Sequence, residues 1–177
     1  MIKRITRKPP RWKENDSIYF LTMCTHGRKP YLHHLAVPEM LTENLNFYSK
    51  KIKELIAFTI MPDHIHLLIE IKDSGEMSDF LRDFKRYTSK EIKRIVGVKN
   101  NHVWQRGTMD HCIRESDANE DFENHLHYLF FNSVKHLGVR PRDYPYHNFK
   151  DIVNRGWLDE DFYNIPEKEL KEFEIYE

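Results

Sequence analysis

The chain has 177 residues and a mass of 21.5 kDa, a size that fits one ordinary domain. Its composition is 40% hydrophobic and 13% aromatic, which is typical of a globular protein and excludes a disordered or fibrous chain. No apolar run approaches the ~20 residues of a membrane span, and residues 1–13 lack the apolar stretch of a secretory signal, so we expect no membrane partner. Two cysteines, Cys24 and Cys112, cannot form a disulfide framework and indicate a reduced, cytoplasmic location.

Charge is balanced overall but unevenly distributed, with 28 basic and 28 acidic residues. Residues 1–13 contain six basic residues and no acidic one, whereas residues 158–177 contain eight acidic and two basic ones. Without that last segment the chain has 26 basic and 20 acidic residues, a net charge of +6. The overall balance therefore hides a basic body and an acidic end, whose charges are typical of a solvated surface. We expect a main domain over residues 1–150 and an acidic C-terminal extension over residues 151–177.

The first half of the chain predicts three strands and one helix. Residues 17–25 (SIYFLTMCT) are rich in aromatic and β-branched side chains and predict a strand that Gly27 and Pro30 end. Pro38 is expected to open a helix that runs to about residue 51. Residues 54–61 and 64–71 predict two further strands, which a tight turn at Pro62 and Asp63 joins into a hairpin.

The second half predicts a long helix, one strand or two short ones, and another helix. The long helix is expected to begin with Ser78 as its N-cap and to end at Gly97. Residues 102–113 supply the strand, and the next helix is expected from about residue 119 to about residue 131. This order predicts an α+β fold of the ferredoxin-like type, an antiparallel sheet with two helices on one face and the other face left open for an active site.

Two pairs of histidines have one residue between them. His64 and His66 lie on a predicted strand, so both side chains point to the same face, opposite the core face that Ile65 begins. Two imidazoles on one sheet face can hold one divalent ion, but they could also belong to an exposed polar strand face. His125 and His127 have the same spacing on a predicted helix, where they point in different directions and cannot share an ion.

A polar pair on the last predicted helix could approach the histidines. Asn132 follows Tyr128 by four residues, so the two share a helix face if the helix continues. Tyr128 is expected to look away from the buried stripe, and the pair could also be a half-buried tyrosine with a C-capping asparagine. The predicted buried stripe consists of Phe122, Leu126, Leu129 and Phe130.

Basic residues recur every three to four positions along the helix that ends at Gly97. Such a stripe can follow DNA phosphates, or it can be a solvated helix face. Aromatic and basic residues just after the helix could add base stacking and phosphate contacts. The predicted DNA-binding residues are Arg82, Lys85, Arg86, Lys90, Lys93, Trp104 and Arg106.

Taken together, these segments resemble the single-tyrosine HUH transposases of bacterial insertion sequences, especially the REP-associated tyrosine transposases. The resemblance covers about residues 17–149, although Ser133 replaces a proline that is usual in that group and residues 108–111 (TMDH) replace a stretch that is often aromatic. It rests on residues 19–32 (YFLTMCTHGRKPYL), 58–71 (FTIMPDHIHLLIEI), 78–92 (SDFLRDFKRYTSKEI), 103–117 (VWQRGTMDHCIRESD), 127–138 (HYLFFNSVKHLG) and 140–149 (RPRDYPYHNF).

The resemblance implies a role for each candidate residue. His64 and His66 would be metal ligands of the HUH motif, Asn132 the third ligand, and Tyr128 the nucleophile. The implied cofactor is Mg²⁺ or Mn²⁺, and the implied substrate is single-stranded or hairpin DNA of the REP type. The implied enzyme is a single-stranded DNA endonuclease and strand transferase that forms a 5′-phosphotyrosine intermediate in DNA transposition, as a monomer or homodimer.

Two other functions stay open at this point. A catalytically silent hairpin-DNA-binding protein would keep the basic surface but would not cut DNA. A metal hydrolase for a small substrate would explain His64 and His66 but neither Tyr128 nor the basic helix. Because all the apparent catalytic residues are present, the transposase is the preferred hypothesis.

Overall fold

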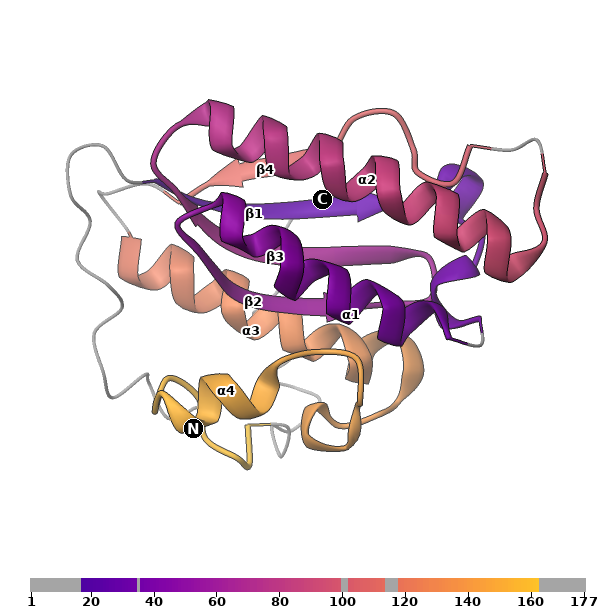
Figure 1. Cartoon of the computed structure of the whole chain (residues 1–177). Coiled ribbons are helices and arrows are strands. Elements are labelled where there is room, and N and C mark those ends of the chain that lie inside the picture. The colour runs from indigo at the N-terminus through magenta and orange to yellow at the C-terminus, as the bar shows by residue number, and fades with distance from the viewer. Residues whose placement is uncertain (1–16, 35, 100–101, 114–117, 163–177) are drawn as a thin grey trace.

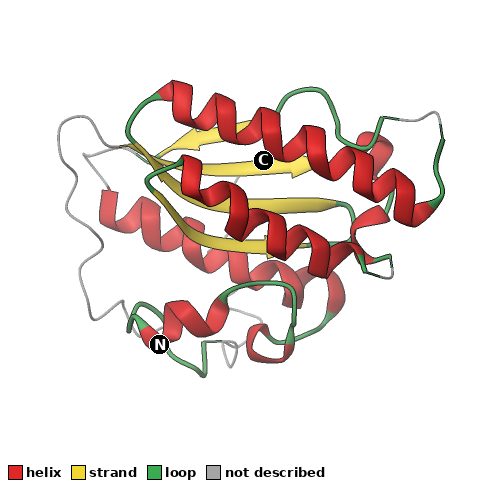
Figure 2. Cartoon of the chain, viewed as in Figure 1, coloured by secondary structure: helices red, strands yellow, loops and turns green. Residues whose placement is uncertain are grey.

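The computed structural model describes residues 17–34, 36–99, 102–113 and 118–162, so the basic segment 1–13 and most of the acidic extension lie outside it (Figures 1 and 2). The strands are β1 (Ser17–Cys24), β2 (Glu54–Ile60), β3 (His64–Ile71) and β4 (Met109–Cys112). The helices are α1 (Val37–Tyr48), α2 (Ser74–Val96), α3 (Ala118–Leu137) and α4 (Phe149–Asn154). No helix in this described part is long and apolar enough to cross a membrane.

The four strands form one antiparallel sheet in the order β2-β3-β1-β4. β1 lies in the centre, with Thr22 opposite His66 of β3 and Phe20 opposite His111 of β4. The order β-α-β-β-α-β and this antiparallel pairing confirm the predicted α+β class.

One face of the sheet packs against α1 and α2, which lie together in front of it in Figure 1. Alternate residues of β3 point to this side, because successive side chains of a strand point to opposite faces. The core here combines Leu21, Met23, Ile65, Leu67 and Ile69 of the sheet with Leu41 and Leu45 of α1 and Phe80, Phe84 and Ile92 of α2.

The second face is covered as well, although the sequence predicts that it is open. Ile18, Phe20 and Leu68 are apolar residues on this face, and burying them stabilises the fold. α3 lies behind the sheet in Figure 1 and packs on them with Phe122, Leu126, Leu129 and Phe130. The predicted stripe of α3 is therefore buried, but the active-site side of the sheet lies beneath a helix.

Three element boundaries differ from the predictions. α2 begins four residues earlier than Ser78, because the Asp73 carboxylate accepts the backbone N–H groups of Gly75 (2.8 Å) and Glu76 (3.0 Å) as the N-cap. α3 continues past residue 131 to Leu137, since no proline or glycine intervenes before Gly138. The predicted strand over residues 102–113 is reduced to the four residues of β4 and an isolated bridge at Trp104.

Residues beyond the expected domain boundary at 150 continue the same core. α4 crosses that position, and Ile152, Trp157 and Phe162 are buried against α3 and Phe149. Residues 151–162 thus pack with the domain, and the expected division into a domain and an acidic extension stays a prediction.

His147 makes the stability of this core depend on pH. Its Nε2 donates a hydrogen bond to Pro141 O (2.5 Å), and its Nδ1 accepts the backbone N–H of Phe149 (3.2 Å). Burial lowers the pKa of His147 below its ordinary value of 6.5. As the pH falls, the ring therefore binds a proton more readily in the unfolded state than in the folded state. The free energy of unfolding therefore falls as the pH drops below about 6.5.

In His147→Gln, the free energy of unfolding should depend less steeply on pH, with a slope that is smaller by at most about 1.4 kcal/mol per pH unit. Urea unfolding between about pH 7 and about pH 5 measures this slope. Some slope should remain, because burial also lowers the pKa of His66, His125 and His127. His34→Gln changes an exposed histidine and should leave the slope unchanged. An unaltered slope in His147→Gln would show that this ring does not contribute.

Candidate active site between the sheet and α3

The two histidines of β3 lie side by side on the face that α3 covers. Their ring centroids are 4.6 Å apart, and both side chains are buried. The strand places them there because residues two apart share a face, which is what the sequence predicts for His64 and His66.

A neighbouring oxygen holds each of these rings through its Nδ1 atom. The His64 Nδ1 is 2.6 Å from Asp63 Oδ1, and the His66 Nδ1 is 2.9 Å from Thr22 Oγ1. A histidine that donates its Nδ1–H to such a partner presents Nε2 as the ligand atom. The carboxylate and the hydroxyl thus supply the outer contacts that a metal-binding histidine pair requires.

Burial favours the neutral form of His66. It lowers the pKa of His66 well below the ordinary value, and the neighbouring His64 lowers this pKa further, while the nearby Asn132 side chain acts in the opposite direction. A neutral imidazole is the form that binds metal, so His66 is ready to act as a ligand near neutral pH.

α3 brings Tyr128 and Asn132 to the same place. The Tyr128 ring centroid is 5.4 Å from that of His66. The Asn132 Nδ2 donates to Tyr128 O at 2.7 Å, and the amide reaches His66. The Lys135 ammonium lies 5.7 Å from the centre of the Tyr128 ring. The four residues assigned by resemblance to metal binding and nucleophilic attack therefore converge from β3 and α3.

Tyr128 does not look away from the core as the sequence predicts, since its side chain is only 3% exposed. The reason is that α3 is covered on two sides, by the sheet and by the chain around α4, so the consecutive residues 125–130 are all buried. A phenol in this position cannot meet a DNA phosphate without some displacement of its surroundings.

The donor set fits a divalent metal ion. Two imidazoles and one amide oxygen lie close together, and an octahedral ion bound by them would keep open positions for phosphate oxygen and water. His64, His66 and Asn132 are the residues that could hold it.

A hollow of about 310 Å³ opens beside His64. Arg28 stands on its rim, 3.6 Å from Asp63, and is the one non-glycine residue of the described chain with positive φ, at 53°. Sequence reasoning missed Arg28, although it lies in the break after β1. The lining residues are Arg28, Met61, Pro62, Asp63, His64, His136 and Leu137.

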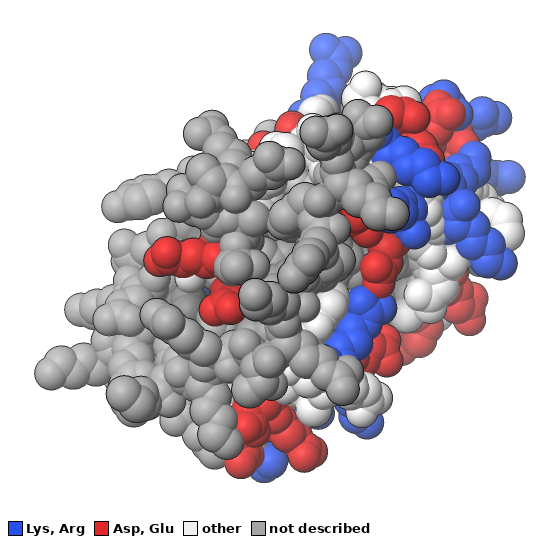
Figure 3. Space-filling view, turned by 90° about the vertical axis from the view of Figure 1, so that its left-hand side faces the viewer, with Lys and Arg blue, Asp and Glu red and all other residues white. Residues whose placement is uncertain are grey.

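The basic residues of α2 divide into two groups. Arg82 is paired with Asp79 (2.6 Å) and Asp83 (3.0 Å), and Figure 3 shows Lys and Arg atoms intermingled with Asp and Glu atoms on the described surface. Acidic neighbours therefore neutralise the charge of Arg82. Lys90 is exposed and lies outside the hollow described next.

The other predicted DNA-binding residues line a hollow of about 440 Å³ between α2 and residues 102–107. Lys85 is anchored there by hydrogen bonds to Gly107 O (2.6 Å) and Thr108 Oγ1 (2.7 Å), and burial lowers its pKa. The positive residues of this basic hollow are Lys85, Arg86, Lys93 and Arg106.

Trp104 is mainly a structural residue, although the sequence suggests it for base stacking. Its side chain is 6% exposed, packs near Phe84, and donates its indole N–H to Thr88 Oγ1 at 3.0 Å. A bridge to Thr25 holds residue 104 at the end of the sheet. Little of the ring is left for a DNA base.

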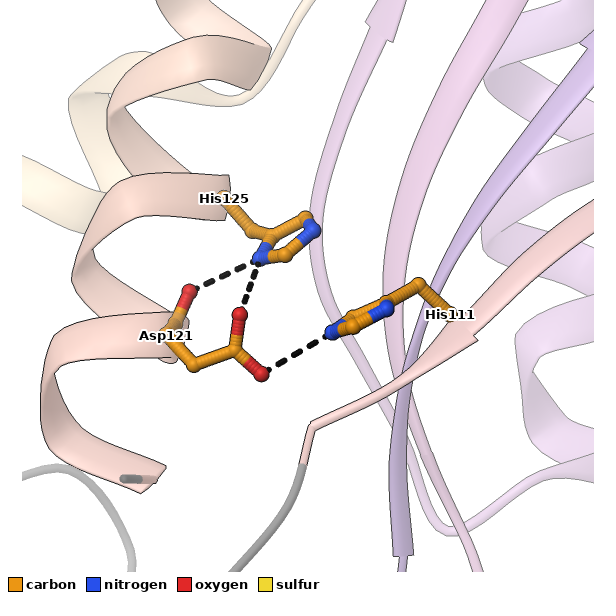
Figure 4. Close-up of side chains that lie close together, drawn as sticks. All are labelled: His111, Asp121 and His125. Carbon is orange, nitrogen blue, oxygen red and sulfur yellow. Dashed lines mark hydrogen bonds and ion pairs between the residues drawn. The ribbon is translucent and has the colours of Figure 1, made fainter. Parts of the chain in front are cut away.

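A second polar cluster lies beside the first and was not predicted. His111 of β4 contacts Asp121 of α3, which also contacts His125 (Figure 4). The spacing of four residues between Asp121 and His125 is a local signal, but His111 comes from another element. Only the fold brings the three together.

Comparisons with known proteins identify the family. Residues 13–119 match the family described as "Transposase IS200 like". The chain belongs to this family. It is therefore a DNA nicking and joining enzyme of the transposase class.

Relatives and one solved structure are similar over longer ranges. A Haemophilus influenzae protein assigned to the REP-associated tyrosine transposases is 28% identical over 169 residues, which cover 87% of this chain and 92% of that protein. The REP-associated tyrosine transposase of Escherichia coli is 30% identical over 104 residues, 58% of each chain. The solved structure of a REP-associated tyrosine transposase bound to a REP hairpin matches the fold with a TM-score of 0.65 and 24% identity, over 86% of this chain and 88% of that one.

Trp104→Phe tests the structural role of the indole. The change keeps an aromatic ring but removes the hydrogen bond to Thr88, so the free energy of unfolding should fall by about 1–3 kcal/mol in urea titrations. Affinity for single-stranded DNA should change by less than about twofold, because phosphate contacts come from other residues. Unchanged stability together with a large loss of affinity would instead assign Trp104 to base stacking.

Proposed function

We propose that this enzyme cuts and rejoins single-stranded DNA beside a hairpin, with Tyr128 as its nucleophile and with a divalent ion held by His64, His66 and Asn132. The observation that carries the proposal is the convergence of these four side chains, with the Tyr128 ring 5.4 Å from His66 and Asn132 in contact with both.

The proposed reaction exchanges one phosphodiester for another. The Tyr128 oxygen bonds to phosphorus and loses its proton, while the bond to the 3′ oxygen breaks and that oxygen gains a proton. The 5′ phosphate stays on the tyrosine, and a 3′-hydroxyl can later reverse the step without an energy source. A phenol with an ordinary pKa of about 10 is a weak nucleophile at neutral pH. The bound ion would polarise the scissile phosphate and offset its developing charge.

The protein's own groups orient the reacting parts. Asp63 and Thr22 hold the two imidazole rings by their Nδ1 atoms. Asn132 is fixed to the backbone of Tyr128, so the third ligand and the nucleophile move together with α3. This coupling supports a site in which the packing of α3 on the sheet places the phenol and Asn132 beside the two histidines.

The two hollows support a continuous path for DNA. β1 ends at the basic hollow, where His26 N donates to Val103 O (2.7 Å), and Thr25 N donates to Asp63 O (2.8 Å) beside the histidines. The residues that follow Thr25 therefore connect the basic hollow to the hollow beside His64. We infer that phosphates run from Arg86 and Lys93 past Arg28 to Tyr128.

Relatives support hairpin DNA as the substrate, and the packing of α3 supports one chain as the working unit. The solved relative of similar fold binds a REP hairpin, and two curated relatives are named for REP association. α3 packs on the sheet of its own chain, which supports a complete site in a monomer. The alternative is a homodimer that exchanges this helix, and a measurement of molecular size together with activity distinguishes the two.

Tyr128→Phe tests the nucleophile. The variant should lose the covalent protein–DNA adduct by at least about a hundredfold while keeping its fold and DNA affinity, because only a hydroxyl is removed. The measurement is a denaturing gel after incubation with labelled single strands that carry the flanking genomic hairpins, plus Mg²⁺ or Mn²⁺. The adduct should hold the 5′ side of the break and should be absent without added metal.

Tyr87→Phe is the matched control, since Tyr87 is an exposed tyrosine of α2 that lines neither hollow, and the variant should form the adduct normally. An adduct in Tyr128→Phe would show that another residue is the nucleophile. No adduct in the wild-type protein with any flanking hairpin would favour the catalytically silent hairpin-binding protein.

A double substitution tests the basic hollow. Arg86→Ala with Lys93→Ala should weaken binding to all single-stranded sequences and reduce the log–log salt slope by about 1.4, at about 0.7 per lost phosphate contact. Arg82→Ala with Lys90→Ala is the matched control from the same helix outside the hollow, and it should leave the slope nearly unchanged. Equal losses in both pairs would mean that the whole stripe binds DNA. Fluorescence anisotropy over a range of salt concentrations separates the outcomes.

A further inference from the structure

The cluster of His111, Asp121 and His125 joins the edge strand of the sheet to α3. The Asp121 carboxylate bridges the edges of the two rings, with Oδ2 at 2.9 Å from His111 Nε2 and Oδ1 at 3.0 Å from His125 Nδ1 (Figure 4). The Asp121 carbonyl oxygen also lies 2.8 Å from His125 Nδ1. The rings stack with centroids 4.6 Å apart. Three potential ligands from two elements therefore face one point.

The spacing of the donor atoms suits a small metal ion. One ligand atom from each residue lies within 4.8 Å of the others, and no other such group of three His, Cys, Asp or Glu residues occurs in the described ranges. Around a tetrahedral ion with bonds of about 2.0–2.2 Å, neighbouring donor atoms are roughly 3.4 Å apart. Binding through His125 Nδ1 would replace the hydrogen bond of this atom to the Asp121 carbonyl, and side-chain rotations would bring the three donor atoms to that distance.

The chemistry of the set differs from that of the first site. Two imidazoles with one carboxylate are typical ligands of Zn²⁺ and related transition-metal ions, which accept three protein ligands and a water molecule. His111 is largely exposed and gives an ion access, whereas His125 is buried.

We propose that His111, Asp121 and His125 form a second metal site, for a transition-metal ion of the zinc class, that ties α3 to β4. Its ligands are distinct from His64, His66 and Asn132. The ligand set also differs, because a carboxylate takes the place of the amide. We expect this site to bind its ion without DNA.

The position of the cluster suggests what the ion would do. The Phe20 ring lies between the two sites, 4.8 Å from His125 and stacked at 5.2 Å from His66. Tyr128 is three residues beyond His125 on the same helix and also contacts Phe20. An ion here would fix α3 against the sheet next to the phenol. This positioning role depends on the proposed function, but the metal binding itself does not.

The test is direct metal binding without DNA. The background is the His64→Ala, His66→Ala double variant, which removes the first site, titrated with Co²⁺ alone and then with Zn²⁺. One Co²⁺ should bind per chain with the visible absorption bands of tetrahedral cobalt, Zn²⁺ should displace it, and Zn²⁺ should raise the melting temperature. His111→Gln or Asp121→Asn in this background should weaken Co²⁺ binding by about tenfold or more. His34→Gln, an exposed control, should not.

If the background variant does not fold, the same titration is made with the wild-type chain and with the single variant His111→Gln. The variant should then bind one ion per chain fewer than the wild-type chain. The proposal is overturned if the folded background binds no Co²⁺, or if His111→Gln and Asp121→Asn bind it as tightly as their parent. The cluster would then be a hydrogen-bonded clamp without metal. Tyr128→Phe should still bind the second ion, so loss of DNA cleavage and loss of this site are distinguished.

Discussion

Antiparallel pairing of β1 with β3 is the constraint on which the rest of the site depends. Its register places Thr22 opposite His66, and the Thr22 hydroxyl then holds the imidazole at 2.9 Å. A shift of one residue would turn both histidines of β3 into the α1–α2 core and bring isoleucine to the site. The same strand places Phe20 against the His66 ring, so β1 fixes the position of this proposed metal ligand through two contacts.

Burial and catalysis make opposing demands on Tyr128. The fold stabilises α3 by placing apolar residues and the tyrosine against the sheet, which leaves the phenol 3% exposed. In the proposed reaction, a phosphate oxygen must nevertheless reach the phenol and the histidines together. The hollow beside His64 lies next to the end of α3, where His136 and Leu137 form part of its wall. A displacement of that end of the helix would admit DNA with the least loss of packing, since residues 135–138 are exposed.

Local patterns in the sequence predict much of this site, and long-range packing supplies the rest. The alternation of β3 and the spacing of Tyr128 and Asn132 depend only on the geometry of one strand or one helix, so the sequence shows that the members of each pair share a face, while the resemblance proposes their roles. The cover over the second face and the burial of Trp104 result from contacts between distant segments, which no local pattern contains. The cluster of His111 with Asp121 also escapes prediction, because its residues face each other only after β4 joins the sheet.

The charge pattern of α2 illustrates the same limit. Helical spacing shows that Arg82, Arg86 and Lys93 share a face, but it does not show that two aspartates neutralise Arg82. The basic residues of the hollow lie toward the end of α2, next to the turn after β1. At this end of the sheet, β3 begins with His64. DNA bound there must pass the turn at Arg28 to reach α3 on the opposite face. The positive φ of Arg28, which costs on the order of 1 kcal/mol in a non-glycine residue, is consistent with a backbone shaped for that passage rather than for stability alone.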